Sequence, residues 1–371
     1  MALTLHGTVA DNTAVLSRPN AKPIIINGDM AVAQRATSAT GLTSASYPVC
    51  DRWLTDIGTG GTWTVSQAAD APTGSGFRNS TKYDCTTANG SLSAGSYMTH
   101  QMRFEGQDLQ LFKKGTSSAE SFTVSFWVKS AKTGTYIVEL EDMDNTRQVS
   151  QAYTISSADT WEKKVLSFPA DTTGAFADDN ASSLHMFFWL LSGTTYASGT
   201  LSTTWTSKTN ANRAVGQVNL ADSTDNDWYI TGVQLEVGDF DANSIAPFQH
   251  ELFGDSLKRC ERYFCKSYNY STAPGTNASS DANAKRGAVF VYRQRDTNNV
   301  GFSFFHPSEM RAVPTMTNFS HDGTSGKFTS STTTTTISTN AALNGTRLSM
   351  AYGAGTAADD NYAHFRCEAE L

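Results

Sequence analysis

Aromatic residues in polar, loop-like segments are the side chains of this sequence whose possible chemistry is easiest to read. A carbohydrate site needs an exposed ring on which a sugar can stack, beside amide and carboxylate groups that bind its hydroxyls. Trp63, Trp205 and Tyr196 lie in segments rich in Gly, Ser and Thr, and we predict that they supply such rings. Packing between subunits is the alternative use of these rings. The tryptophans expected in the core are Trp53, Trp161, Trp189 and Trp228.

Motifs for catalysis are missing from the sequence. It contains no His-Glu-x-x-His, Cys-x-x-Cys or Gly-x-Ser-x-Gly pattern, so zinc and nucleophile-elbow chemistry have no support at this level. Gly323 to Lys327 resembles part of a phosphate-binding loop, but Phe328 stands where Ser or Thr is required. Because Ser, Asp and Glu are plentiful, a dispersed triad or a glycosidase carboxylate pair stays open. We expect a protein that is not an enzyme and that needs no cofactor.

Composition narrows the possible partners. Only 17% of residues are charged and the net charge is −7, so no basic stripe exists for nucleic acid. No run of 18 apolar residues is present, so we expect no membrane insertion. The 5 cysteines are odd in number and widely spaced, which favours buried, unpaired thiols. The start of the chain lacks a secretory signal, as expected for a protein made in a cytoplasm and released by lysis, or for an ordinary cytosolic protein.

Alternation of polar and apolar residues predicts an all-β protein with one short helix. The segment 121–129 alternates at period two, and the almost wholly apolar segment 184–191 reads as a central strand covered on both faces. The predicted parts are an extended arm over 1–23, a jelly-roll β-sandwich over 24–252, a linking helix over 253–270 and a smaller C-terminal β-sandwich over 271–371. The helix would carry an apolar stripe made of Leu257, Cys260, Tyr263 and Phe264.

Three stretches of the sequence resemble a module of bacteriophage fibre and other virion proteins. They are 26–35 followed by 47–53, then 232–239 followed by 246–250, then 257–264. The resemblance spans about residues 24 to 268 and implies a jelly roll similar to carbohydrate-binding modules, with a helix leading into a distal domain. One departure is Ala246-Pro247-Phe248-Gln249, where the family often has Ala-Thr-Pro-Phe-Glu.

The resemblance carries several expectations about function. It implies a homotrimeric tail fibre or spike subunit of a tailed bacteriophage, located in the virion, with residues 1–23 anchored to other virion proteins and a host-surface glycan as ligand. The apolar stripe of the helix would then pack about the trimer axis. Analogy with carbohydrate-binding modules allows a structural Ca²⁺ held by Asp29 and Glu236. The alternatives are a capsid decoration protein or head fibre, a glycan-degrading tailspike, and a secreted cellular carbohydrate-binding module.

Overall fold

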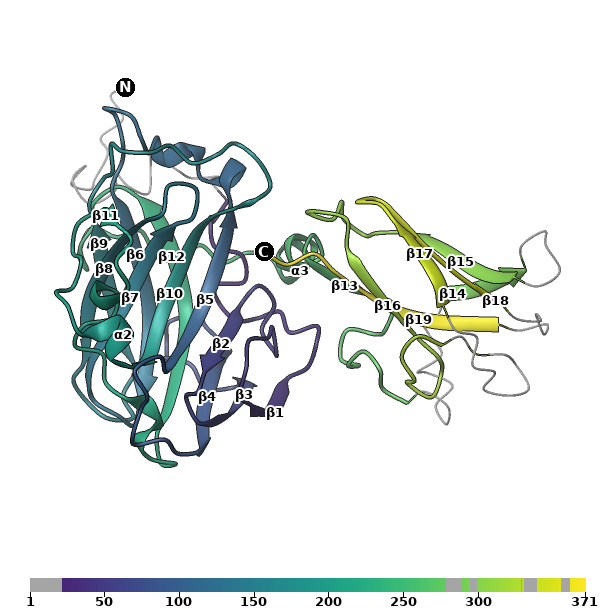
Figure 1. Ribbon diagram of the computed structural model, residues 1–371, viewed down its shortest axis with the longest axis horizontal. Coiled ribbons are helices and arrows are strands. Elements are labelled where there is room, and N and C mark those ends of the chain that lie inside the picture. The colour runs from purple at the N-terminus through teal and green to yellow at the C-terminus, as the bar shows by residue number, and fades with distance from the viewer. Residues whose placement is uncertain (1–21, 278–288, 294–298, 328, 330–338, 355–360) are drawn as a thin grey trace, which may run out of the picture.

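The computed structural model describes residues 22–277, 289–293, 299–327, 329, 339–354 and 361–371. Figure 1 shows a large β-sandwich joined through the helix α3 to a smaller β unit, with the C-terminus lying between the two parts. The predicted anchoring arm, residues 1–23, falls outside the described residues except for its last two positions. Among the described residues no helix has the length and apolarity needed to cross a membrane.

Two six-stranded antiparallel sheets form the sandwich and confirm the prediction for this part of the chain. We call them the first sheet and the second sheet. In spatial order, the first sheet consists of β1 (Ser38–Leu42), β3 (Thr62–Ala68), β4 (Ser80–Thr87), β12 (Asp227–Val237), β6 (Phe122–Ser130) and β9 (Glu162–Phe168). The second sheet consists of β11 (Thr206–Ser207), β8 (Arg147–Ile155), β7 (Gly134–Asp142), β10 (Ser182–Ser192), β5 (Tyr97–Glu105) and β2 (Leu54–Gly58).

Strand β10 occupies the centre of the second sheet, as its apolar sequence predicts. It pairs with β7 on one side and β5 on the other, and all its residues except the two terminal serines are buried. Its inward side chains, Met186 and Phe188 among them, join the main core between the sheets. Its outward side chains, Phe187 and Trp189, belong to a second small cluster on the outer face of the sheet. A strand covered on both faces has no need of polar residues.

The connections include one short α-helix and four 3₁₀ helices among the described residues of the sandwich. They are η2 (Gly106–Asp108), η3 (Gln110–Phe112), α2 (Thr194–Ala197), η4 (Asn210–Asn212) and η5 (Leu220–Asp222). The α2 helix follows β10 directly and lies against the outer face of the second sheet (Figure 1).

The C-terminal unit is also β and begins after a helix shorter than expected. Helix α3 (Phe253–Cys260) ends 10 residues before the predicted boundary at 270. Seven antiparallel strands follow; six are hydrogen-bonded in the order β13-β19-β14-β15-β18-β17, and β16 pairs with β19 outside this path. They are β13 (Phe264–Lys266), β14 (Val289–Arg293), β15 (Asn299–Phe305), β16 (Thr315–Phe319), β17 (Thr339–Asn344), β18 (Leu348–Ala354) and β19 (Asn361–Glu368).

The apolar stripe assigned to a trimer interface is buried inside a single chain. Its members are Leu257, Cys260, Tyr263 and Phe264. Three of them are at most 1% exposed and the first is half-buried. Ile26 and Val32 of the sandwich pack against this stripe, together with Leu371 at the end of the chain. The assignment to a contact between subunits is therefore wrong for Cys260, Tyr263 and Phe264, because the same chain already covers them. For the half-buried Leu257 it stays a prediction. The trimer itself stays a prediction.

Charged side chains join the sandwich to the C-terminal unit, and we call this contact the junction. The Arg52 guanidinium lies 3.4 Å from the centroid of the Tyr263 ring and forms an ion pair with Glu370. It also donates a hydrogen bond of 2.6 Å to the carbonyl oxygen of Arg103. Arg52 adopts a left-handed backbone conformation, with φ of 73°, which a non-glycine residue keeps only where its surroundings hold it. Arg262 forms two hydrogen bonds of 2.7 and 2.8 Å with the Glu105 carboxylate at the end of β5.

Candidate functional site

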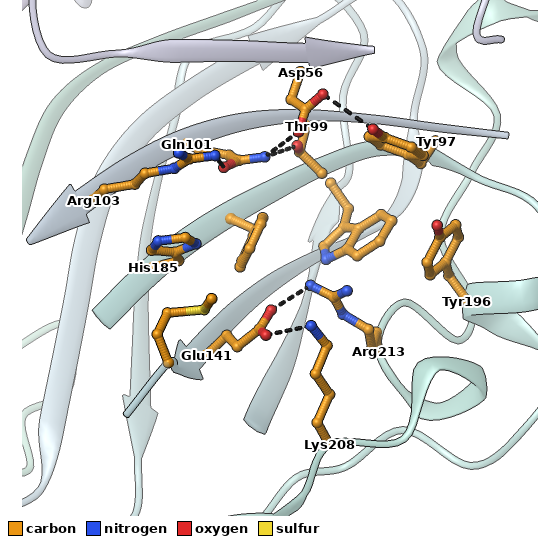
Figure 2. Close-up of a pocket in the computed structure, with 13 residues that line it drawn as sticks. Asp56, Tyr97, Thr99, Gln101, Arg103, Glu141, His185, Tyr196, Lys208 and Arg213 are labelled. Atoms are coloured by element: carbon orange, nitrogen blue, oxygen red, sulfur yellow. Dashed lines mark hydrogen bonds and ion pairs between the residues drawn. The ribbon is translucent and has the colours of Figure 1, made fainter. Parts of the chain in front are cut away.

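A polar and aromatic pocket lies on the outer face of the second sheet. Its volume is about 250 Å³. Figure 2 shows side chains from β2, β5, β7 and β10 forming its floor, with residues of α2 and the following loops at its rim. The lining residues are Asp56, Tyr97, Thr99, Gln101, Arg103, Glu141, Met143, His185, Phe187, Trp189, Tyr196, Lys208 and Arg213.

Strand pairing fixes the order of the floor residues. Alternate residues of a strand share one face, so every second residue of β5 and β10 points outward. Gln101 lies opposite Phe187 in the β5–β10 pair. One row further, Arg103 is opposite His185, which in turn is opposite Glu141 on β7.

Aromatic rings form the apolar part of the pocket. Trp189 lies on its floor and is only 2% exposed. Tyr97 and Tyr196 are half-buried and meet edge to face, with ring centroids 5.7 Å apart. The Tyr196 ring is also 5.3 Å from the Trp189 ring, so the short helix α2 holds it against the sheet. The two tyrosines therefore keep part of each ring accessible beside a fixed indole.

An ion-pair cluster forms one side of the pocket. Glu141 pairs with both Lys208 and Arg213, and the Arg213 contact measures 2.8 Å. Arg213 also donates a hydrogen bond of 2.8 Å to the Glu139 carboxylate. The same carboxylate accepts a 2.9 Å hydrogen bond from the Trp189 indole N–H. Burial raises the pKa of Glu139 although Arg213 opposes the rise. The cluster thus ties the aromatic floor to a fixed cation.

The opposite side carries neutral hydrogen-bonding groups around one carboxylate. Asp56 accepts a 3.1 Å hydrogen bond from the Tyr97 hydroxyl and a 3.3 Å bond from the Gln101 amide. Gln101 also donates 2.7 Å to the Thr99 hydroxyl. Burial, reinforced by the charge of Asp56, raises the pKa of Tyr97. Figure 2 shows this group and the Glu141 cluster at opposite sides of the pocket.

His185 is a neutral member of the pocket floor. Its Nε2 lies 2.7 Å from the Ser182 hydroxyl. Burial, and after it the positive charges of Arg103, Lys208 and Arg213, lowers the pKa of His185 to about 3. The ring is therefore uncharged near neutral pH and contributes hydrogen bonding rather than charge.

One of the three rings predicted from sequence lies in this pocket. Tyr196 lines it, whereas Trp63 and Trp205 are 0% and 8% exposed. The Trp63 indole packs in the main core and donates 2.8 Å to the Gly60 carbonyl, and the Trp205 indole donates 2.8 Å to the Pro169 carbonyl. The expectation of exposed rings is wrong for both. The Trp63 ring points inward from β3 into the main core, and the Trp205 ring lies in the same core with its centroid 5.8 Å from that of Phe122.

The predicted calcium ligands are not part of a ligand cluster. Asp29 accepts a weak 3.4 Å hydrogen bond from the Ala31 amide, and its pKa is raised by burial. Glu236 lies on β12 opposite Thr123 of β6. Within the described part of the chain, the only group of three or more potential metal ligands lies elsewhere, in the C-terminal unit: Cys265, His306 and Cys367.

Most residues of the pocket were not predicted from the sequence as site residues. Strand β5 was not predicted, although Tyr97, Thr99, Gln101 and Arg103 alternate there with residues of the main core such as Met98. That alternation is the signal that could have found the face. Trp189 was expected in the core, and it is buried, but it faces outward into the pocket. Which face of the sheet would be covered by α2 and the 200–213 loop is not encoded in any single strand.

Three solved structures are similar to this chain over part of its length. The enzymatically active domain of tailspike protein 4 from bacteriophage CBA120 is 16% identical with a TM-score of 0.28, over 50% of this chain and 19% of that one. A putative sugar binding protein from Bacteroides thetaiotaomicron VPI-5482 is 12% identical with a TM-score of 0.32, over 58% and 100% of the two chains. TmCBM61, in complex with β-1,4-galactotriose, is 8% identical with a TM-score of 0.29, over 58% and 99%.

The matched region thus spans about a fifth of the tailspike domain, 19% of its length. At these TM-scores none of the three identifies a ligand or a binding residue in this chain. No family model and no curated protein matches the sequence.

Proposed function

We propose that the sandwich binds a carbohydrate in the pocket on the outer face of the second sheet. The observation that carries this proposal is the pair of half-buried tyrosine rings, Tyr97 and Tyr196, set beside the carboxylates of Asp56 and Glu141. A sugar offers C–H groups that pack on an aromatic face and hydroxyls that need donors and acceptors around its edge. The pocket supplies both.

The size and charge of the pocket favour a short, neutral part of a glycan. Its volume of about 250 Å³ lies just below the roughly 300–1,000 Å³ of sites for drug-sized ligands. Two of its three cations are paired with carboxylate side chains, since Glu141 neutralises Lys208 and shares Arg213 with Glu139. The third, Arg103, donates hydrogen bonds of 2.7 Å to the Leu371 oxygen and 3.4 Å to the Gln101 side-chain oxygen. A strongly acidic ligand would have to break these pairs, whereas neutral hydroxyls can bond to groups that stay in place.

The arrangement of the carboxylates supports a binding role without catalysis. Glycosidases place two carboxyl groups on either side of the scissile bond, one of them free to give up a proton. Here Glu141 lies between two cations, and Asp56 accepts hydrogen bonds from Tyr97 and Gln101. Both acids hold other side chains in position. A glycan-degrading tailspike is the alternative that a test for cleaved ends must address.

We infer further that the chain is a fibre or spike subunit of a tailed bacteriophage, located in the virion and assembled as a homotrimer. The order and spacing of the three motif stretches supports this role. A trimer would multiply weak single-site affinity through effective concentration. Light scattering on the full chain measures the number of copies, and a mass of 40.0 kDa would contradict the trimer. A capsid decoration protein or head fibre differs only in the place of attachment, which microscopy of virions would reveal.

Replacement of a pocket ring tests the carbohydrate site. Tyr196→Ala should weaken binding of a glycan identified on an array by about 5-fold or more, because truncation of an important aromatic contact residue costs about 1 kcal/mol or more. Trp161→Ala is the matched control, since Trp161 is a half-buried aromatic residue next to β9 of the first sheet. Calorimetry should find wild-type affinity for the control. Equal losses in both variants, or unchanged affinity in Tyr196→Ala, would contradict the pocket, and release of reducing ends would identify an enzyme.

A further inference from the structure

Three potential metal ligands meet in the interior of the C-terminal unit. The Sγ atoms of Cys265 and Cys367 and a ring nitrogen of His306 all lie within 4.8 Å of one another, and all three residues are buried. They come from β13, from the turn after β15, and from β19. Because the three residues are far apart in the sequence, they form no short metal-binding motif such as Cys-x-x-Cys.

Strand pairing places the two thiols face to face. Cys265 and Cys367 are directly opposite in the antiparallel β13–β19 pair, and both are unpaired thiols. His306 approaches from the side, with Nδ1 3.7 Å from the Cys265 Sγ. In a tetrahedral zinc site with bonds of about 2.3 Å to sulfur and 2.0–2.1 Å to nitrogen, neighbouring ligand atoms are about 3.6 Å apart. The observed separation therefore fits two ligands of one ion.

The imidazole is oriented by a further hydrogen bond. Its Nε2 lies 3.0 Å from the Ser349 hydroxyl, and His306 and Ser349 are both buried. With Nε2 protonated and donating to this oxygen, the lone pair of Nδ1 faces the thiols. Histidine ligands in metal sites usually have such a partner on the second nitrogen, because it fixes both the tautomer and the ring plane.

A fourth soft atom lies next to the group. The Met310 Sδ is 3.9 Å from the Cys265 Sγ, and Met310 is 1% exposed. Two thiols, an imidazole and a thioether form a donor set that suits thiophilic ions and is poor for Ca²⁺ or Mg²⁺, which prefer oxygen.

We propose that Cys265, His306 and Cys367 bind one thiophilic d¹⁰ metal ion, Zn²⁺ or Cu⁺, inside the C-terminal unit. The ion ties β13, which follows the linking helix, to β19 and to the turn after β15. Its effect is structural, because the site is closed to solvent. The proposal is independent of the carbohydrate pocket, which lies on the sandwich.

The described part of the surrounding core leaves the ion a role. Among the described residues of this unit, the buried apolar cluster has 8 members: Cys265, Phe302, Met310, Ala351, Ala363, Phe365, Cys367 and Ala369. Three of the members are alanines, which bury little apolar surface. Small cores of this kind are commonly reinforced by a metal ion or by disulfides.

Metal binding would release the protons of the two thiols, since thiolates are the metal ligands.

Metal analysis of the full chain tests the site. Protein purified without chelators under anaerobic conditions should contain about one equivalent of Zn or Cu per chain by mass spectrometry. Metal-free protein should then be titrated separately with Zn²⁺, with Cu⁺ and with Co²⁺. Co²⁺ should give a thiolate-to-metal charge-transfer band. The metal carried by the purified protein, and not the relative affinity, indicates the physiological ion, because metal availability decides selectivity in cells.

Substitutions locate the ion. Cys265→Ser and Cys367→Ser should each lower the affinity at least about 100-fold, and Ser349→Ala about 10- to 100-fold through the orientation of His306. Cys260→Ser is the matched control, since Cys260 is an equally buried thiol on α3 outside the group, and it should bind like the wild type.

Two results would overturn the proposal, and neither depends on a variant that folds. One is wild-type protein that binds less than a tenth of an equivalent of every ion tried. The other is a disulfide between Cys265 and Cys367 in the anaerobically purified chain.

Discussion

The proposed carbohydrate pocket and the junction place similar side chains on the same sheet but use them in different ways. Both arise on β5, where Arg103 lines the pocket and Glu105 lies at the junction. In the pocket, Arg213 and Glu141 are 8% and 3% exposed, pair with each other and form part of the pocket lining. At the junction, Arg52 is 2% exposed and covered by Tyr263 and Glu370.

The difference lies in where the partners come from. Arg213 and Glu141 are 72 positions apart and belong to the same sandwich, whereas Arg52 and Glu370 are 318 positions apart and belong to different units. Partners within one fold can hold a surface in shape without closing it. Where the partner belongs to the other unit, that unit packs over the ion pair and excludes water from it. Charged residues in a sheet therefore do not reveal by type alone whether they bind a ligand or join two units.

Removal of the junction cation should have the largest effect. Arg52→Ala leaves the Glu370 carboxylate with Arg35 as its remaining cationic partner and uncovers the Tyr263 ring. Breaking a buried ion pair costs about 3–5 kcal/mol, and denaturant unfolding should register a loss of that size. Lys113→Ala is the control, because Lys113 forms an exposed pair with Glu120, and its loss should cost at most about 1 kcal/mol. A loss below about 1 kcal/mol in Arg52→Ala would show that the two units are held together by other contacts.

Acid should act on the pocket before it acts on the junction. The pKa of His185 is lowered to about 3 by burial, so as the pH falls below about 6.5 the unfolded chain binds a proton that the folded chain does not. The free energy of unfolding should therefore decrease by up to about 1.4 kcal/mol per pH unit from this residue between those two values. His185→Gln should make the measured slope shallower over this range, and an unchanged slope would contradict the assignment.

Protonation of the junction carboxylate Glu105 should destabilise the fold in a lower pH range than that of His185. Burial opposes its ionisation, but hydrogen bonds from Arg262 and Tyr263 outweigh burial and lower its pKa. A carboxyl group with a lowered pKa stabilises the fold above its unfolded value, about 4.3. This stabilisation is lost as the pH falls further towards the folded pKa. The His185→Gln variant separates the two windows, because it leaves Glu105 unchanged.

The smallest effect is expected for the exposed cation of the pocket. Lys208→Met removes one of the two partners of Glu141, and Arg213 remains. Because Lys208 is 28% exposed, the stability loss should be at most about 1 kcal/mol. Denaturant unfolding and glycan calorimetry on one sample should find near-native stability with affinity lowered a few-fold. If Lys208→Met lowered the free energy of unfolding as much as Arg52→Ala, the pocket ion pairs would contribute as much to stability as those of the junction.

Strand periodicity allowed much of the fold to be predicted, because it depends on neighbouring residues alone. The 184–191 segment was expected to be a central strand, and β10 is one. Polarity of flanking residues was a poor guide to exposure, however. Trp63 lies among Gly and Thr yet is buried, because its ring points inward from β3 while the polar neighbours face out. Tyr196 has a similar sequence context, and α2 places it at the pocket rim.

The β class, the sandwich and the burial of the cysteines could be predicted from the sequence alone, because the alternation of polar and apolar residues is a local property of each strand. Tertiary structure alone decided which outward rows became a pocket, which charges became a junction, and which thiols met His306. Each of these sites joins residues from strands far apart in the chain. Their meeting depends on strand order and register, which no local pattern specifies.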